Sequence, residues 1–158
     1  GVWLVIDDIR CAGDHKLRTQ FILDSQVAGS PSQVNDLKIW SEIPLALEKT
    51  FISKKYNELE ESHKLVKIQK FSDRIIDATL IMDQSFTVKY HTVYQTDGRR
   101  LPNALAIEIE NDCTNKLILV LNDDIYKGEK LCVVNGIKMR GKCVIYDKKT
   151  CTKIRLKS

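Results

Sequence analysis

Turn-forming residues divide this 158-residue chain into three parts. There is no glycine between Gly29 and Gly98, and Pro44 is the only proline between Pro31 and Pro102. The segments on either side carry Gly, Asn-Gly and Asp-Gly combinations, which are typical of the turns that join strands. This distribution predicts strands at both ends of the chain and a helix in the middle.

The middle segment carries a spacing that is typical of an amphipathic helix. Its apolar, aromatic and histidine residues recur at spacings of four, three, four and three: Ile52, Tyr56, Leu59, His63 and Val66. Pro44 suits the first position of a helix, where a missing N–H costs nothing. We therefore predict one long amphipathic helix over about residues 44–71 and expect a shorter one near residues 34–40.

The two flanks read as strands. Residues 2–9 and 17–23 are expected to form a strand pair around a turn at residues 12–14. Residues 86–90 and 105–109 alternate apolar with polar side chains, as a strand with one dry and one wet face does. Residues 117–121 are apolar throughout, which favours a central, doubly covered strand. Asn135-Gly136 predicts a tight hairpin, and residues 143–146 and 152–156 add two strands.

This order of elements favours an α+β fold with a mainly antiparallel sheet. The length predicts a single domain over residues 1–158, with a strand pair and helical middle in residues 1–74 and a strand-rich half in residues 75–158. The strands of residues 86–156 resemble in pattern a small, partly open barrel of the OB type, and a β-sandwich fits the same pattern. The resemblance covers about half the chain and has no family motif behind it.

Cysteine usage and hydropathy bear on the compartment. The longest apolar run, at residues 117–121, is far shorter than the roughly 18 residues of a membrane span. The five cysteines cannot all pair within one chain. Since disulfides belong to oxidising compartments, we expect an intracellular protein of the cytoplasm or nucleus.

Positive charge is concentrated at the C-terminal end. Residues 127–158 hold ten basic and two acidic side chains, a net charge of +8, whereas the other 126 residues carry −4. If the strands are extended, two sets of three cations each share one face: Lys138, Arg140 and Lys142, and Lys153, Arg155 and Lys157. Ile154 and Leu156 would then form a dry underside, while a bulge at Gly141 could displace the end of the first set.

Such a face predicts binding of nucleic acid or another polyanion, because Lys and Arg neutralise phosphates and release counterions. Tyr146 is the best candidate for stacking on a base, and the turn at Arg99-Arg100 could touch phosphate. An alternative is a solvated face, or one whose cations pair across the sheet with Glu108 and Glu110.

No pattern points to catalysis, to a metal or to a cofactor. The three histidines lie in different segments, and the cysteines lack the close spacing of zinc ligands. The neighbouring carboxylates in Asp7-Asp8 and in Asp123-Asp124 would point opposite ways in a strand. We therefore predict a non-enzymatic binding domain. The alternative is a structural or protein-interaction module, with a protein partner or self-association, anchored by Trp40 or by the predicted helical stripe.

Overall fold

The computed structural model describes residues 1–25, 29–121 and 131–157, and these residues form β-strands and connecting turns without any helix. The predicted α+β fold is therefore wrong. Among the described residues there is accordingly no helix with the length and hydropathy to cross a membrane. The chain divides into two compact units: unit 1 is Gly1–Asp73 with Asp77–Gln84, and unit 2 is Arg74–Ile76 with Ser85–Ser158. That the chain forms one domain stays a prediction.

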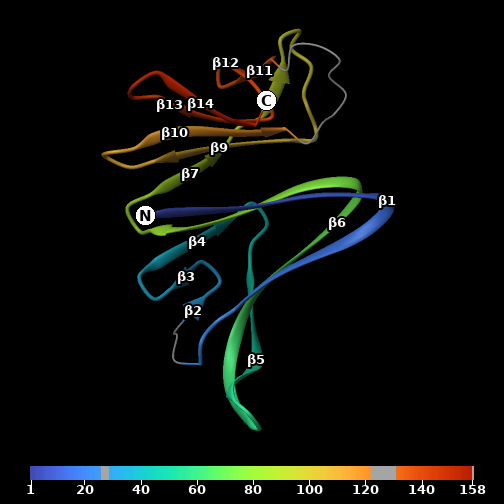
Figure 1. Ribbon diagram of the computed structural model, residues 1–158, viewed down its shortest axis with the longest axis vertical. Helices are drawn as coiled ribbons and strands as arrows, with labels where there is room; N and C mark the ends of the chain where they lie inside the picture. The colour runs from blue at the N-terminus through green and yellow to red at the C-terminus, as the bar shows by residue number, and fades with distance from the viewer. Residues whose placement is uncertain (26–28, 122–130, 158) are drawn as a thin grey trace. The chain divides into compact units, whose positions relative to one another are not determined.

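Unit 1 is built on one antiparallel sheet in which the strand order is β1-β6-β4-β3-β2 and β5 pairs separately with β6 (Figure 1). The strands are β1 (Val2–Ile22), β2 (Gly29–Ser30), β3 (Gln33–Val34), β4 (Leu37–Ser41), β5 (Ala46–Lys55) and β6 (Glu58–Asp83). Because β6 pairs with β1, β4 and β5 along its length, it is the strand that holds this unit together.

The strand pair β1 and β6 bends sharply part-way along (Figure 1). At the bend, Gly13 adopts φ 87° and Asp73 φ 61°, and the Gly13 N–H donates to Asp73 Oδ1 at 2.8 Å. Glycine reaches such a positive φ without a steric penalty. The predicted turn at residues 12–14 is therefore wrong: the glycine bends one long strand and does not reverse it, because β6 continues as its partner.

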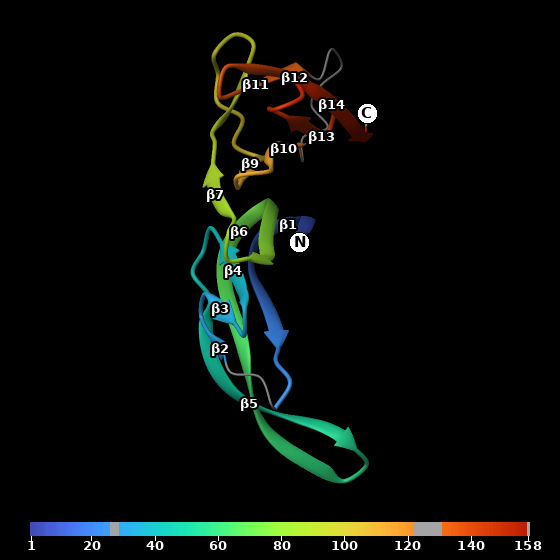
Figure 2. The same ribbon diagram turned by 90° about the vertical axis from the view of Figure 1, so that its left-hand side faces the viewer.

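The predicted helix over residues 44–71 is wrong, because this segment is the hairpin of β5 and β6 (Figure 2). Phe51 lies opposite Glu61, and Asn57 closes the turn at φ 61°. Val66 is buried at 2% exposure whereas Tyr56 is 93% exposed, so the helical stripe corresponds to no common face. The shorter helix near residues 34–40 is also wrong, because strands β3 and β4 pair there.

A buried ion pair joins the two halves of β6 in unit 1. The Lys67 side chain is 0% exposed, and its Nζ lies 2.7 Å from Oδ1 of Asp77, which is 5% exposed. The ammonium group also donates to Ser41 Oγ at 2.7 Å and to Thr79 Oγ1 at 2.8 Å. A charge in such a place is tolerated only when it is paired and its remaining donors are satisfied, as they are here.

Unit 2 is a sandwich of two antiparallel sheets, with strand orders β14-β13-β10-β9-β7 and β12-β11-β8. Its strands are β7 (Thr87–Tyr90), β8 (Val93–Gln95), β9 (Ala104–Glu110), β10 (Asn115–Leu121), β11 (Leu131–Val134), β12 (Ile137–Arg140), β13 (Cys143–Asp147) and β14 (Thr152–Lys157). Both sheets contribute to one core, in which Leu117 and Leu119 of β10 meet Val134 and Met139 of the smaller sheet.

Two local predictions for this half are confirmed. The apolar strand β10 lies between β9 and β13, and its successive residues Leu117, Ile118 and Leu119 are all buried, as expected of a central strand. Asn135 and Gly136 form the turn of the β11–β12 hairpin with φ 47° and 75°. A turn with positive φ at both central residues matches the twist of the strands it joins.

Candidate functional site

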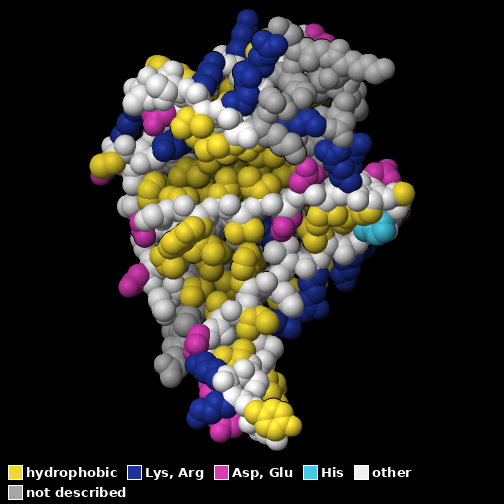
Figure 3. All heavy atoms as spheres, viewed as in Figure 1, with side chains coloured by type: hydrophobic (Ala, Val, Ile, Leu, Met, Phe, Trp, Pro, Cys, Tyr) yellow, Lys and Arg dark blue, Asp and Glu magenta, His cyan; other side chains and the backbone are white. Residues whose placement is uncertain are grey.

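Four cations of unit 2 surround one surface depression of about 410 Å³, which we call the basic depression. Its described lining consists of Lys138 and Arg140 of β12, Lys153 and Arg155 of β14, and the apolar residues Leu131 and Val144. All four cations are exposed, and none of these lining residues is acidic. Lys and Arg side chains gather over the part of unit 2 where β11 and β12 lie (Figure 3).

Hydrogen bonds from side chains of β14 to the backbone of β12 hold these cations together although 15 residues separate them in sequence. Strands β12 and β14 are the end strands of the two sheets of the sandwich. Lys153 Nζ donates to the backbone oxygen of Lys138 at 2.8 Å, and Arg155 Nε donates to that of Arg140 at 3.2 Å. Two side chains of β14 therefore cap the open edge of β12, which protects it from pairing with other chains.

Lys142 and Tyr146, two further residues of the predicted face, are not part of the described lining of the depression. Lys142 follows Gly141, which adopts φ 132°, and it is half-buried outside the lining. Tyr146 is also half-buried, and Lys153 Nζ lies 5.6 Å from its ring centroid. A hydrogen bond with Cys151, with burial, raises the pKa of Tyr146. The side chain of Lys157 lies outside the described residues, as do Lys127 and Lys130.

The basic turn places its two arginines differently. Arg99 is held within the turn, where Nε lies 2.7 Å from Asp97 Oδ2 and the guanidinium donates to Gln95 Oε1 at 3.2 Å. The Arg99 backbone N–H also donates to Asp97 Oδ1 at 3.0 Å, and this hydrogen bond, together with that from the guanidinium, lowers the pKa of Asp97. Arg100 forms an isolated bridge opposite Tyr94 at the edge of the three-stranded sheet and is exposed.

Two predictions about sheet faces are wrong. Ile154 and Leu156 are 57% and 62% exposed and form no dry underside, because β14 is an edge strand. Glu108 does not lie on a wet face: only 4% of its surface is exposed, because it lies opposite Leu117 on the face of β9 that carries the core residue Ala106. An alternating pattern cannot distinguish a solvated polar position from a buried one that carries an ion pair.

Glu108 is the centre of a charged cluster that sequence reasoning missed in part. His91 Nε2 lies 2.7 Å from Glu108 Oε2, and Lys148 Nζ donates to Oε1. Desolvation raises the pKa of Glu108, but the hydrogen bonds from Lys148 and His91 outweigh it, so the pKa is lowered. Lys148 belongs to the basic C-terminal segment but not to the predicted face, and Glu110 pairs at 3.5 Å with Lys89, which lies outside that segment. The pairing of these two carboxylates with the cations of the predicted face therefore stays a prediction. The available signal was a carboxylate between two apolar residues, Ile107 and Ile109, in the strand.

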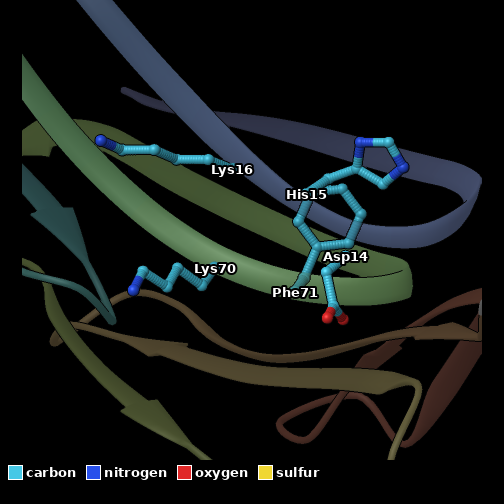
Figure 4. A pocket seen from close by; sticks show the side chains of 5 residues that line it. All are labelled: Asp14, His15, Lys16, Lys70 and Phe71. Atoms are coloured by element: carbon cyan, nitrogen blue, oxygen red, sulfur yellow. The ribbon is translucent and has the colours of Figure 1, made fainter.

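A second depression, of about 610 Å³, lies at the bend of β1 and β6 in unit 1 and is lined by Asp14, His15, Lys16, Lys70 and Phe71. The rings of His15 and Phe71 lie 5.8 Å apart, and His15 Nε2 donates to the Ala12 backbone oxygen at 2.8 Å. The ammonium ends of Lys16 and Lys70 lie away from the Asp14 carboxylate (Figure 4). This depression has two cations against the four of the basic depression, and its lining includes a carboxylate.

Metal-ligating side chains are not clustered within the residues that the structure describes. No set of three His, Cys, Asp or Glu side chains there is close enough to hold a metal ion. Asp123-Asp124 lies outside the described residues. Burial raises the pKa of the Cys132 thiol to about 11, which disfavours the nucleophilic thiolate. Comparison of the chain with protein-family models, with characterised proteins and with solved structures finds no match.

Proposed function

We propose that this chain is a non-enzymatic binding domain that holds a polyanion, with nucleic acid as the first candidate, in the basic depression. One observation carries the proposal: two cations from each of two separate strands converge on one hollow whose described lining includes no carboxylate. Like charges repel, so such an arrangement is stabilised when phosphates lie between them. The edge cap occupies only one donor each of Lys153 and Arg155, whose side chains have three and five N–H groups.

We infer from its cysteines that the protein acts inside the cell, as a nucleic-acid ligand requires. Its five cysteines are all free, and Cys113 and Cys151 are exposed thiols. Exposed free thiols persist in a reducing compartment, where nucleic acids are found.

The test is fluorescence anisotropy with labelled single-stranded and double-stranded DNA and RNA, and with labelled heparin as a polyanion without bases. If the four cations each contact one phosphate, a plot of the logarithm of the affinity against the logarithm of the salt concentration should have a slope of about −3 for single strands and about −3.6 for duplex DNA. The double variant Arg140→Glu/Arg155→Glu should abolish this binding.

A matched control shows whether a loss of binding comes from the basic depression or only from the change in net charge. The double variant Lys16→Glu/Lys70→Glu makes the same change in net charge on exposed lysines of unit 1 and should bind as the unchanged protein does. Since Arg155 caps β12, Lys138→Glu/Arg140→Glu provides a second variant that leaves the capping side chains in place. Equal losses in the control and the site variants would contradict the proposal, as would no binding at low salt.

A second candidate is a protein-interaction module, and the end of the β5–β6 hairpin favours it. Phe51, Tyr56 and Leu59 are 61%, 93% and 74% exposed there, and apolar side chains are visible at this end of unit 1 (Figure 3). Exposed aromatic residues are enriched at interfaces. Trp40, the anchor expected from the sequence, is half-buried in β4. Sedimentation velocity over a range of concentrations tests self-association, which Tyr56→Ser/Leu59→Ser should remove.

A further inference from the structure

Strand register aligns four residues in one row across the three-stranded sheet of unit 2. Tyr94 of β8 lies opposite Val133 of β11, which lies opposite Lys138 of β12. On the other side of Tyr94, the isolated bridge places Arg100 opposite it. Directly opposed residues in antiparallel pairs point to the same face of a sheet. Arg100, Tyr94, Val133 and Lys138 therefore share a face.

That face is the outer one. The residues of the neighbouring row, Cys132 and Met139, are 1% and 0% exposed and belong to the core, so the alternate positions point outward. Tyr94 is 41% exposed, and Arg100 and Lys138 are exposed. The row thus has a cation at each end, with Tyr94 beside Arg100 and Val133 between Tyr94 and Lys138.

The row is continuous with the basic depression. Lys138 belongs to both, and the next outward pair of the same hairpin is Leu131 opposite Arg140, which also line the depression. With neighbouring strands about 4.8 Å apart, the row spans about 14 Å from Arg100 to Lys138. A short stretch of polyanion could therefore contact both cations and the depression.

We propose that the ligand of the basic depression is a single-stranded nucleic acid and that Tyr94 is the platform on which one of its bases stacks. Non-specific single-strand binders combine cations along the backbone with aromatic rings that take the flat face of any base. Bases in a duplex keep their faces stacked inside the helix, so an exposed ring adds little for a duplex. Tyr146 is a poor platform, because it is half-buried and has Lys153 near its ring. This inference rests on the proposed function.

The experiment compares Tyr94→Ala with Tyr56→Ala in the full chain, using anisotropy with a labelled single-stranded oligonucleotide and with labelled heparin. Tyr56 is the matched control, since it is an exposed tyrosine of unit 1. We expect Tyr94→Ala to weaken oligonucleotide binding about 5- to 150-fold, the range for loss of one stacked base. Its salt slope should not change, because the phosphate contacts remain. Heparin binding should be unchanged, and Tyr94→Trp should retain oligonucleotide binding.

The outcomes separate the two claims. If the Arg140→Glu/Arg155→Glu variant loses binding but a folded Tyr94→Ala protein binds the oligonucleotide as the unchanged protein does, the stacking inference is overturned and the proposed function stands. If heparin binds and no oligonucleotide does, the ligand is a charged polysaccharide and the inference is overturned likewise. If no polyanion binds, both claims fail. Should Tyr94→Ala unfold, Tyr94→Leu with an intact circular dichroism spectrum provides the ring-free comparison.

Discussion

Replacing Lys67 by methionine tests the buried ion pair of unit 1 most directly. Methionine keeps most of the apolar length of the lysine side chain and removes its charge. The ammonium group has four partners within 3.1 Å: Asp77, Ser41, Thr79 and the backbone oxygen of Ala78. The substitution therefore leaves the Asp77 carboxylate buried without its counterion.

The expected loss of unfolding free energy depends on the hydrogen bonds that Asp77 keeps in the variant. Removing one partner of a buried pair costs about 3–5 kcal/mol. Asp77 still accepts hydrogen bonds from Thr19 at 3.0 Å and from Gln69 at 2.6 Å, so we expect the lower end, about 3 kcal/mol. In the double variant Lys67→Met/Asp77→Asn neither charge remains. Its cost should therefore be smaller than the sum of the single costs by about 1–3 kcal/mol.

The assay is urea unfolding followed by tryptophan fluorescence, because both tryptophans of the chain, Trp3 and Trp40, lie in unit 1. The free energy of unfolding is taken from the linear extrapolation, with the slope compared between variants. A Lys67→Met protein within about 1 kcal/mol of the unchanged one, at the same slope, would refute the reasoning. It would show that the Lys67 ammonium group is not held as a buried charge.

Two further predictions concern unit 2. The folded-state pKa of Glu108 lies below the ordinary 4.5, so its contribution to stability is complete above the unfolded pKa and is lost as the pH falls through the folded one. In the Glu108→Gln variant, the free energy of unfolding should therefore fall less between about pH 6 and pH 3 than in the unchanged protein. The measurement is urea unfolding monitored by circular dichroism at each pH, and an equal fall in the variant and the unchanged protein would contradict the prediction. Because burial raises the pKa of Cys132 to about 11, iodoacetamide at about pH 8 should label exposed Cys113 and Cys151 in the native protein. Mass spectrometry should find label on Cys132 only after denaturation, and native labelling there would show that β11 opens readily.

Local signals predicted the strands whose partners are close in sequence. The hairpin of β11 and β12 needs only Asn135-Gly136, whose positive φ values specify the turn. The central position of β10 follows from its unbroken apolar run, because such a strand must be covered on both faces. These predictions depend on a few adjacent residues, so distant partners could not overturn them.

The long strands of unit 1 could not be predicted in this way. Strand β6 pairs with β1 and β4, which lie at a distance in sequence, and these long-range pairings override the local helical spacing. The turn at Asn57 has no glycine to mark it. The burial of Lys67 depends on Asp77 beyond the bend, and no pattern in the segment around Lys67 specifies that meeting.

The sequence predicted which cations of one strand share a face, but it did not predict that the cations of the two strands would meet. Alternation placed Lys138 with Arg140 and Lys153 with Arg155, and each pair does share one depression. The meeting of the two pairs depends on how the sheets of the sandwich face each other. Gly141 removes Lys142 from the set, since its φ of 132° breaks the alternation on which that prediction rested.

The edge cap and the proposed binding site use the same side chains of β14, and they can be separated. The cap takes the backbone oxygens of Lys138 and Arg140 as acceptors, so it does not depend on the charges of those two residues. A purely structural role predicts that substitutions of Lys153 and Arg155 lower stability while those of Lys138 and Arg140 change nothing measurable. A binding role predicts that both pairs lower affinity for the polyanion equally, whatever they do to stability. If substitution of any of the four cations lowers the affinity for the polyanion, the depression is a binding site. If only substitutions of Lys153 and Arg155 have an effect, and that effect is on stability, these side chains serve as an edge cap alone.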